Sequence, residues 1–138
     1  MNKSAMYIFA NQGLRMSPGK LAAQVAHAAV RALYESGSQD RETWLARGET
    51  KIVLLATDSD HLRNIQEFLR KKGYNSYLVI DEGRTEIAPH SATALGVQIL
   101  DRDNEQVQRD FADFRTYKAL PPDVKRRWYD PGNRLKAA

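Results

Sequence analysis

Four polar side chains in the first quarter of the chain have the spacing of one helix face. They follow each other at intervals of four, three and four residues: Lys20, Gln24, His27 and Arg31. In a helix, residues at such intervals lie on the same side. An amine, an amide, an imidazole and a guanidinium on one side could bind an anionic ligand. A solvated helix face beside an alanine-rich buried stripe is the alternative, and by spacing alone it is the simpler interpretation.

Lys20 differs from the other three because it falls in the first turn of the expected helix. Ser17, followed by proline, is a typical helix start with serine as the N-cap. The free backbone N–H groups and the dipole of such a terminus favour anions. Gly13 and Gly19 are separated by five residues and leucine follows the lysine, whereas a P-loop has four intervening residues and then Lys-Ser or Lys-Thr. We therefore expect no nucleoside triphosphate site.

A carboxylate and two hydroxyls form the second candidate group. Asp81 follows an apolar segment, and Thr85 and Thr93 come four and twelve residues later. In open α/β sheets, ligands bind at the C-terminal ends of strands. A carboxylate beside hydroxyls at that edge could hold a water molecule and accept its proton. A turn stabilised by aspartate and threonine is the alternative, and periodicity does not separate the two.

The histidines and serines do not form a metal-binding or nucleophile pattern. No pair among His27, His61 and His90 has the spacing of a helical metal site, and the chain contains no cysteine. Neither Ser17 nor Ser91 lies in a nucleophile-elbow motif. We therefore expect no metal, no cofactor and no covalent serine or thiol catalysis.

The elements that would position these side chains alternate between strand and helix. Four strands are expected, at 6–10, 51–57, 74–80 and 92–99. Helices are expected at 18–36, 39–47, 60–72 and 103–118. The apolar run of the second strand is typical of a central strand covered on both faces. The alternation predicts an α/β domain with a mostly parallel or mixed sheet.

We expect one domain at 1–100, with a C-terminal helical extension at 101–138 packed on it. A length of 138 residues fits one compact domain. The extension has an apolar stripe that must be buried, made of Val107, Phe111 and Phe114. Packing on the same domain is the simpler interpretation, and a homodimer contact is the alternative. After the prolines at 121–122, we expect one or two helical turns at 123–128 and then a loose tail.

The composition describes a mildly basic chain with its own hydrophobic core. It is 42% hydrophobic and 28% charged, with a net charge of +4. No apolar run approaches the roughly 20 residues that span a bilayer, and residues 1–10 lack the apolar centre of a signal peptide. We therefore expect a cytoplasmic protein with no membrane partner. Residues 1–34 contain four basic and no acidic residues, which places positive charge around the helix that carries Lys20.

Two motifs together resemble the type 2 peptidyl-tRNA hydrolase family, the archaeal and eukaryotic-type enzyme. The first is MSPGKLAAQVAHAA at 16–29, and the second is DEGRTEIAP at 81–89, followed by TALG at 93–96. The similarity runs from about residue 5 to residue 97. The resemblance implies a small α/β domain with a four-stranded mixed sheet flanked by helices. It also implies hydrolysis, without a cofactor, of the ester between peptide and tRNA, which releases tRNA for reuse in translation.

The resemblance further implies which residues act. The catalytic residues would be Lys20, Asp81, Thr85 and Thr93. Gln24, His27 and Arg84 would bind the substrate. Arg15 and Arg31 are added to them on a separate ground, because tRNA binding should be mainly electrostatic and basic side chains, including Arg84, can contact its phosphates. In our hypothesis Asp81 positions or deprotonates the water, and Lys20 with the helix N-terminus stabilises the developing negative charge. The threonines and Gln24 would orient the water, the carbonyl or the terminal ribose.

By this resemblance the chain would be a divergent member of the family. Glu82, Glu86 and His90 stand where the family usually has alanine, glutamine and glycine, and the customary Gly-Pro after Gly96 is absent. The two glutamates add negative charge beside the expected RNA site. A catalytically inactive RNA- or protein-binding module of the same fold is therefore one alternative, and hydrolysis of a different ester or amide is another. The intact set of implied catalytic residues favours the hydrolase.

Overall fold

The fold is that of a small α/β domain with a mixed sheet at its centre. The computed structural model describes residues 3–82 and 90–121. The main strands are β1 (Ser4–Asn11), β2 (Lys51–Ala56), β3 (Ser76–Ile80) and β4 (Ala92–Val97). Their order is β2–β1–β4–β3, and the two-residue β5 (Leu100–Asp101) also pairs with β1. Strand β1 is parallel to β2 and antiparallel to β4, and β3 is antiparallel to β4. The predicted mixed sheet is confirmed.

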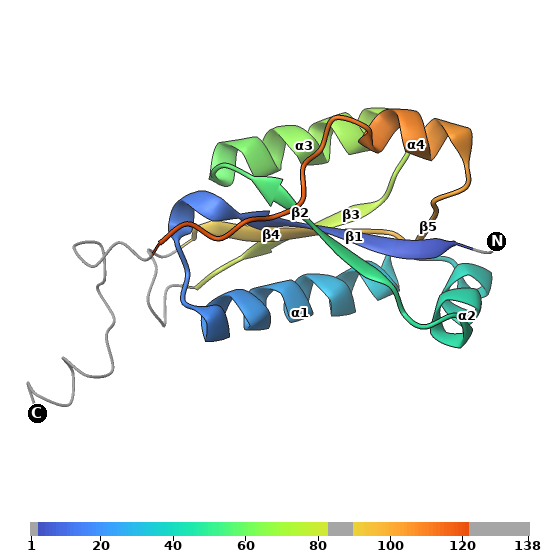
Figure 1. Ribbon diagram of the computed structural model, residues 1–138, viewed down its shortest axis with the longest axis horizontal. Coiled ribbons are helices and arrows are strands. Elements are labelled where there is room, and N and C mark those ends of the chain that lie inside the picture. The colour runs from blue at the N-terminus through green and yellow to red at the C-terminus, as the bar shows by residue number, and fades with distance from the viewer. Residues whose placement is uncertain (1–2, 83–89, 122–138) are drawn as a thin grey trace, which may run out of the picture.

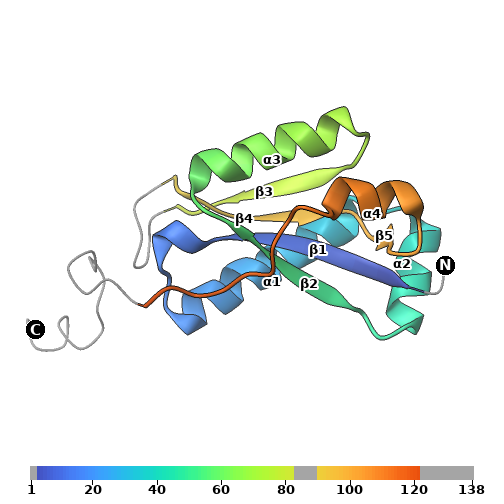
Figure 2. The ribbon, with the colours of Figure 1, turned by 45° about the horizontal axis from the view of Figure 1, so that its top comes forward.

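Strand β2 lies at one end of this order, so the prediction of a central strand was wrong. Strand β1 is central instead, with both neighbours hydrogen-bonded to it. The outer side of β2 pairs with a later segment of the chain, which Figure 2 shows crossing it. The Leu55 N–H donates to the Arg115 carbonyl at 2.7 Å, and the Tyr117 N–H donates to the Val53 carbonyl at 2.9 Å. This pairing covers part of an otherwise open edge.

Helices cover both faces of the sheet (Figure 1). On one face lie α1 (Pro18–Tyr34) and α2 (Ser38–Ala46). On the other lie α3 (Ser59–Lys71) and α4 (Glu105–Phe111). A short 3₁₀ turn, η1 (Gln12–Leu14), connects β1 toward α1. In the part of the chain that the structure describes, no helix is long and apolar enough to cross a membrane.

Small residues allow α1 to lie very close to the sheet. Ala28 and Ala32 are completely buried. A Cβ atom placed on Gly96 of β4 would lie 2.3 Å from the Ala28 carbonyl oxygen and 3.0 Å from the Ala32 Cβ. Only glycine therefore fits at this crossing. The close contact fixes the height of α1 above the sheet, and with it the position of the helix start.

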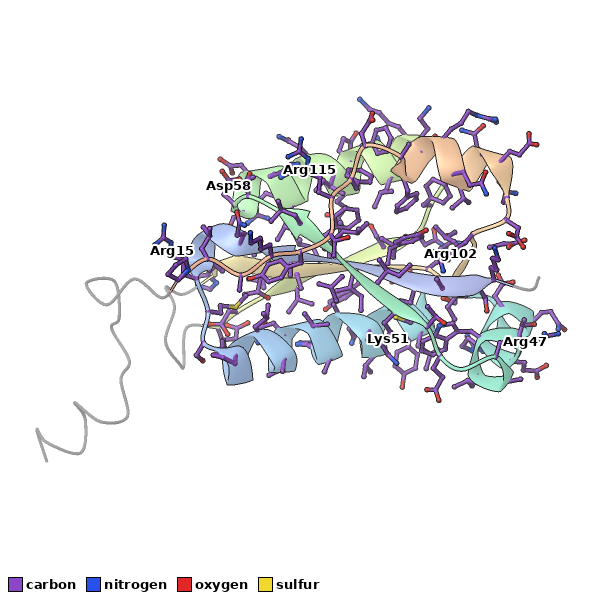
Figure 3. All side chains as sticks on the ribbon, in the orientation of Figure 1. Arg15, Arg47, Lys51, Asp58, Arg102 and Arg115 are labelled. Atoms are coloured by element: carbon purple, nitrogen blue, oxygen red, sulfur yellow. The ribbon has the colours of Figure 1, made fainter. Side chains whose placement is uncertain are left out.

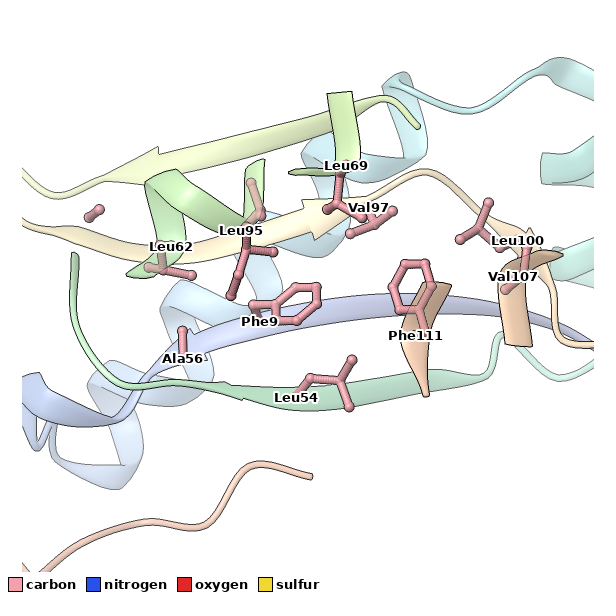
Figure 4. Close-up of a cluster of buried hydrophobic side chains, with 12 residues drawn as sticks. Phe9, Leu54, Ala56, Leu62, Leu69, Leu95, Val97, Leu100, Val107 and Phe111 are labelled. Carbon is pink, nitrogen blue, oxygen red and sulfur yellow. The ribbon is translucent and has the colours of Figure 1, made fainter. Parts of the chain in front are cut away.

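Large aromatic side chains fill the opposite face (Figure 4). Phe111 of α4 stacks on Tyr7 at 4.4 Å between ring centroids, and Phe114 meets Phe9 edge-on at 4.8 Å. Val107 is also part of this cluster. The predicted stripe is thus buried against this chain's own sheet. Helix α4 ends at Phe111 and not at residue 118, because the residues after it leave the helix to pair with β2.

Candidate functional site

Lys20 and Asp81 form a buried ion pair at one end of the sheet. The Lys20 Nζ lies 2.6 Å from the Asp81 Oδ1, and each side chain is only 9% exposed. Lys20 is in the first turn of α1, and Asp81 directly follows β3. The two residues are 61 positions apart in the sequence. The fold therefore brings together the two candidate groups that the sequence analysis identified separately.

Local hydrogen bonds hold both partners in place. The Ser17 Oγ accepts from the Lys20 N–H at 3.3 Å, which confirms the predicted N-cap. The Asp81 N–H donates to the Ser91 carbonyl at 2.9 Å, and the Asp81 carbonyl accepts from the His90 N–H at 2.7 Å. These two backbone bonds close the connection between β3 and β4 on either side of the carboxylate. Both charged groups therefore project from anchored backbone.

Gln24 and Thr93 form a second buried contact, one helical turn further along α1. The Thr93 hydroxyl donates to the Gln24 Oε1 at 2.5 Å, and it also lies 3.4 Å from the Val79 carbonyl. Thr93 is fully buried and Gln24 is 8% exposed. Gln24 thus faces the sheet and is not part of a solvated face. The contact connects α1 to β4 next to the ion pair.

Asn11 is a buried polar residue at this end of the sheet that was not among the predicted site residues. It is the last residue of β1, and its Nδ2 donates to the Ala92 carbonyl at 2.8 Å. Its Oδ1 accepts from the Leu14 N–H at 3.3 Å. Asn11 therefore ties the end of β1 to the start of β4 and to η1. An asparagine that ends an apolar strand two residues before a glycine was the available signal.

The remaining predicted site residues lie further from the ion pair or outside the described residues. Arg31 is eleven residues after Lys20, about 16 Å along a helix axis, and its guanidinium lies 4.2 Å from the centre of the Tyr77 ring. His27 is exposed. Arg15 is exposed just before α1 (Figure 3), and its guanidinium donates to the Pro121 carbonyl at 3.3 Å. Thr85 and Arg84 are outside the described residues, as are the turns expected at 123–128 and the tail after them.

The charges in this site come from the lysine and the aspartate. Within residues 3–82 and 90–121, no group of three or more His, Cys, Asp or Glu side chains could hold a metal ion. An ammonium and a carboxylate beside a helix N-terminus can polarise a carbonyl, stabilise an oxyanion and orient water. The arrangement therefore fits hydrolysis or binding of a polar ligand at the end of the sheet.

A second lysine–aspartate pair lies on the α3–α4 face and has a different environment. The Lys72 Nζ is 3.8 Å from the Asp110 Oδ1. The Tyr74 hydroxyl donates to the Asp110 Oδ2 at 2.6 Å, and the Gln106 amide donates to the Oδ1 at 2.8 Å. The tyrosine hydrogen bond is the main cause that holds the pKa of Asp110 below its usual value. Burial, and then this hydrogen bond, raise the pKa of Tyr74.

The chain is similar to one family of known proteins over most of its length. A family model described as peptidyl-tRNA hydrolase PTH2 matches residues 4–117. A protein of Methanopyrus kandleri named peptidyl-tRNA hydrolase is 44% identical over 87 residues, 61% of this chain and 74% of that protein. A protein of the same name from Staphylothermus marinus is 39% identical over 93 residues, 65% and 77% of the two chains. The one from Halobacterium salinarum is 33% identical over 108 residues, 78% and 96%.

Proposed function

The chain belongs to the peptidyl-tRNA hydrolase PTH2 family, and we propose that it hydrolyses the ester bond between a peptide and its tRNA, using the buried Lys20–Asp81 pair. The products are a free peptide and a tRNA that can be used again in translation. The family match confirms the resemblance noted in the sequence. The observation that carries the assignment of the site is the ion pair itself, because it connects the two motifs of that resemblance.

The ion pair is better explained by chemistry than by stability. Moving two charges out of water has a desolvation penalty that their mutual attraction repays only in part. Apolar residues of similar volume at such a position are often neutral or stabilising. Lys20 and Asp81 are each 9% exposed, so this penalty applies to both. A pair of this kind at the end of a sheet, where ligands bind in α/β folds, supports a functional role.

In the proposed mechanism Asp81 holds the attacking water and accepts its proton. The water oxygen bonds to the ester carbonyl carbon, and the negative charge on the carbonyl oxygen is stabilised by Lys20 and the N–H groups at the start of α1. The bond from this carbon to the ribose oxygen then breaks, and the proton passes to that oxygen. Thr93 and Gln24, which already contact each other, orient the reacting groups together with Thr85.

We further propose that tRNA is bound chiefly through its phosphates. Arg15, Arg31 and Arg84 are the expected contacts, together with His27. Phosphate binding releases counterions, so KM for peptidyl-tRNA should rise steeply with salt. A KM that does not change between 50 and 200 mM salt would contradict this part of the proposal.

We also place the reaction in the cytoplasm, where its substrate is made. We propose that it proceeds without a metal, so that activity should survive chelation with EDTA.

A turnover assay with N-blocked aminoacyl-tRNA tests the proposed function. The protein should release free tRNA at a rate proportional to enzyme concentration. The same preparation is tested for tRNA binding by fluorescence anisotropy. Binding without turnover would identify an inactive RNA-binding module, and neither binding nor turnover would favour a different ester or amide substrate. Asp81→Asn is the matched inactive control, because it changes the charge with almost no change in shape.

A homodimer is a separate proposal. The apolar stripe of α4 is buried in its own chain, so a second chain would contact other surfaces. Three large apolar side chains are exposed on α1 and α2: Val30, Tyr34 and Leu45. Light scattering distinguishes a dimer from the 15.7 kDa monomer. If a dimer is found, Tyr34→Ser should reduce its mass, whereas a change at the α4 stripe should act on folding.

A further inference from the structure

Strand β4 contains a β-bulge at Thr93. Its pairing with β3 steps from Val79–Ala94 directly to Ile80–Ala92, so Thr93 is the extra residue between the two pairs. An extra residue of this kind bends the strand and changes the side of the sheet to which a side chain points. Bulges occur often beside active sites for that reason. The orientation of Thr93 therefore depends on the bulge.

The bulge makes Thr93 face α1. Leu95 and Val97 point to the α3–α4 face of the sheet, where both belong to the aromatic cluster (Figure 4). Side chains alternate along a regular strand, so strict alternation would send Thr93 to that face as well. Its hydroxyl instead donates to the Gln24 side chain of α1. In a strand without the bulge, this hydroxyl would lie on the opposite side of the sheet from Lys20.

The side chain of Asn11 holds β4 at the bulge. The pairing between β1 and β4 ends at Ala10–Ala94. The next pair along the two strands would set Asn11 opposite Thr93. At this point the Asn11 Nδ2 donates to the Ala92 carbonyl at 2.8 Å, which belongs to the peptide that joins Ala92 to Thr93. The side-chain amide thus takes the place of a backbone hydrogen bond where the strand bulges.

Asn11 is itself held from several sides. Its backbone lies opposite Ala56 of β2, and its Oδ1 accepts from the Leu14 N–H at 3.3 Å. The Nδ2 also donates to the Oγ of Ser59, the first residue of α3, at 3.3 Å. This Oγ in turn donates to the same Ala92 carbonyl at 3.3 Å. Asn11 is only 1% exposed, and a buried amide with its donors and its acceptor engaged has a fixed orientation.

We propose that Asn11 is a positioning residue, which holds the bulge and so keeps the Thr93 hydroxyl on the face of the sheet where α1 carries Lys20. The inference rests on the proposed function, in which Thr93 orients the reacting groups. Asn11 acts through Thr93 and not by contact with the substrate. A displacement of about 1 Å in a reacting group can cost about 10²-fold in rate. Loss of the Asn11 amide should therefore lower kcat and leave KM nearly unchanged.

The test is a double-mutant cycle in the full chain, with N-blocked aminoacyl-tRNA as substrate. Asn11→Ala should lower kcat by about ten- to a hundredfold while KM stays within about twofold of the parent. Thr93→Val removes the hydroxyl with little change in shape, and it should lower kcat as well. In the Thr93→Val protein, Asn11→Ala should change kcat by less than about twofold, because the group that it positions is already gone. A purely structural role of Asn11 would multiply the two losses.

Asn104→Ala is the matched control, since Asn104 is another asparagine that binds backbone. Its Oδ1 accepts from the Gln106 and Val107 N–H groups at the start of α4. Loss of this cap should lower the melting temperature while kcat stays at the parental value. Ser59→Ala is the milder variant if Asn11→Ala gives little folded protein. It removes one of the two side-chain donors to the bulged strand, so it should lower kcat by a smaller factor, and only when the threonine hydroxyl is present.

A measurement without substrate reports the position of Thr93 directly. With isotope-labelled threonine methyl groups, nuclear Overhauser effects should connect the Thr93 side chain to α1 in the parent. In Asn11→Ala these effects should weaken or disappear, whereas Asn104→Ala should keep them. This arm does not depend on any turnover of the protein.

Parental kcat in folded Asn11→Ala would overturn the inference, and so would Overhauser effects between Thr93 and α1 that are the same as in the parent. An undiminished loss of kcat from Asn11→Ala in the Thr93→Val protein, or an equal loss from Asn104→Ala, would also overturn it. If the parent protein turns over no peptidyl-tRNA, the proposed function fails. The Overhauser effects then still decide whether Asn11 positions Thr93.

Discussion

Two lysine–aspartate pairs lie on opposite sides of the same sheet, and they are built differently. Lys20 and Asp81 are 2.6 Å apart, and both side chains are almost completely buried. Lys72 and Asp110 are 3.8 Å apart, and the lysine is 46% exposed. Neutral donors, the Tyr74 hydroxyl and the Gln106 amide, make the short contacts to Asp110. The short contacts that hold Asp110 thus come from neutral groups and not from its lysine. Asp81, in contrast, makes its short ion pair with a lysine that is itself buried.

The two faces of the sheet also differ in the size of the side chains that pack against them. Alanines on α1 approach Gly96 closely and leave the polar groups of α1 against the end of the sheet. On the other face, Phe9 and Phe111 lie in a cluster of larger apolar side chains, with Phe114 packed against it (Figure 4). Burial of aromatic and aliphatic surface is the main source of stability. The α1 face therefore holds the site, and the α3–α4 face holds much of the stabilising core.

The largest expected effect is on turnover when the buried pair is changed. Asp81→Asn removes the proton acceptor and Lys20→Met removes the positive charge, so each should lower kcat by about 10²- to 10⁴-fold, the usual range for general acid–base catalysis. Asp110→Asn is the matched control, because it makes the same chemical change at the other pair. It should lower the melting temperature while the folded protein keeps its kcat. A folded Asp81→Asn protein with parental turnover would remove the distinction between the two pairs.

A substitution in the aromatic cluster of the α3–α4 face should, in contrast, lower stability and leave turnover unchanged. Phe111→Ala removes a ring that is 8% exposed and lies against Tyr7, Phe9 and Tyr74. Truncation of a buried phenylalanine costs about 3–5 kcal/mol. Urea unfolding should show this loss, and kcat of the protein that stays folded should be within about twofold of the parent. If kcat fell as strongly as with Asp81→Asn, the two faces would be coupled and the separation of roles would be wrong.

Much of the fold follows from local patterns in the sequence. The N-cap at Ser17, the 3.6-residue period of α3 and the apolar strands were all predictable, because caps and amphipathic periods are local. The position of β2 was not, because an apolar run looks the same in a central strand and in an end strand covered by a later segment. The end of α4 was predicted too late because a contact distant in sequence ends the helix. Thr116 pairs with Leu54, 62 residues before it, so the chain leaves the helix before that point.

The candidate site was predictable as two separate groups and not as a pair. Spacing placed Lys20 at a helix start and Asp81 at a strand end, but only the resemblance to a family suggested that the two act together. Helical spacing also grouped Gln24 with His27 on a solvated face. The structure turns Gln24 toward Thr93 and leaves His27 exposed. A helix that lies close to a sheet buries a wider sector than its apolar residues indicate.

A substitution that pushes α1 away from the sheet should have a smaller effect on stability than Phe111→Ala, but it should also lower turnover. Gly96→Ala would place a Cβ 2.3 Å from the Ala28 carbonyl, so α1 must shift. Overpacking of this kind typically costs about 1–3 kcal/mol. Because Lys20 is carried by the same helix, kcat should fall as well, unlike with Phe111→Ala. Gly19→Ala is the control for stability, since a Cβ there has no neighbour within 4 Å. It should leave the free energy of unfolding unchanged or raise it.

The smallest expected effect is the pH dependence of the second pair. The Tyr74 hydrogen bond lowers the pKa of Asp110 in the folded protein, so the bond stabilises the fold when the carboxylate is ionised. This stabilisation is fully present above the ordinary aspartate pKa of about 3.9, and it is lost as pH falls through the lower folded-state pKa. Tyr74→Phe should therefore lower the melting temperature at pH 6, by less than Gly96→Ala does, and the difference from the parent should shrink toward pH 3.

Tyr117→Phe is the control for this measurement. Burial raises the pKa of Tyr117, but in the described part of the chain no hydrogen bond joins its hydroxyl to a carboxylate. Its effect on the melting temperature should therefore not diminish between pH 6 and pH 3. A Tyr74→Phe difference that stays constant over this range would show that the ring, and not the bond to Asp110, provides the stabilisation. The second pair would then be an incidental contact on the α3–α4 face, and the contrast with Lys20–Asp81 would rest on burial alone.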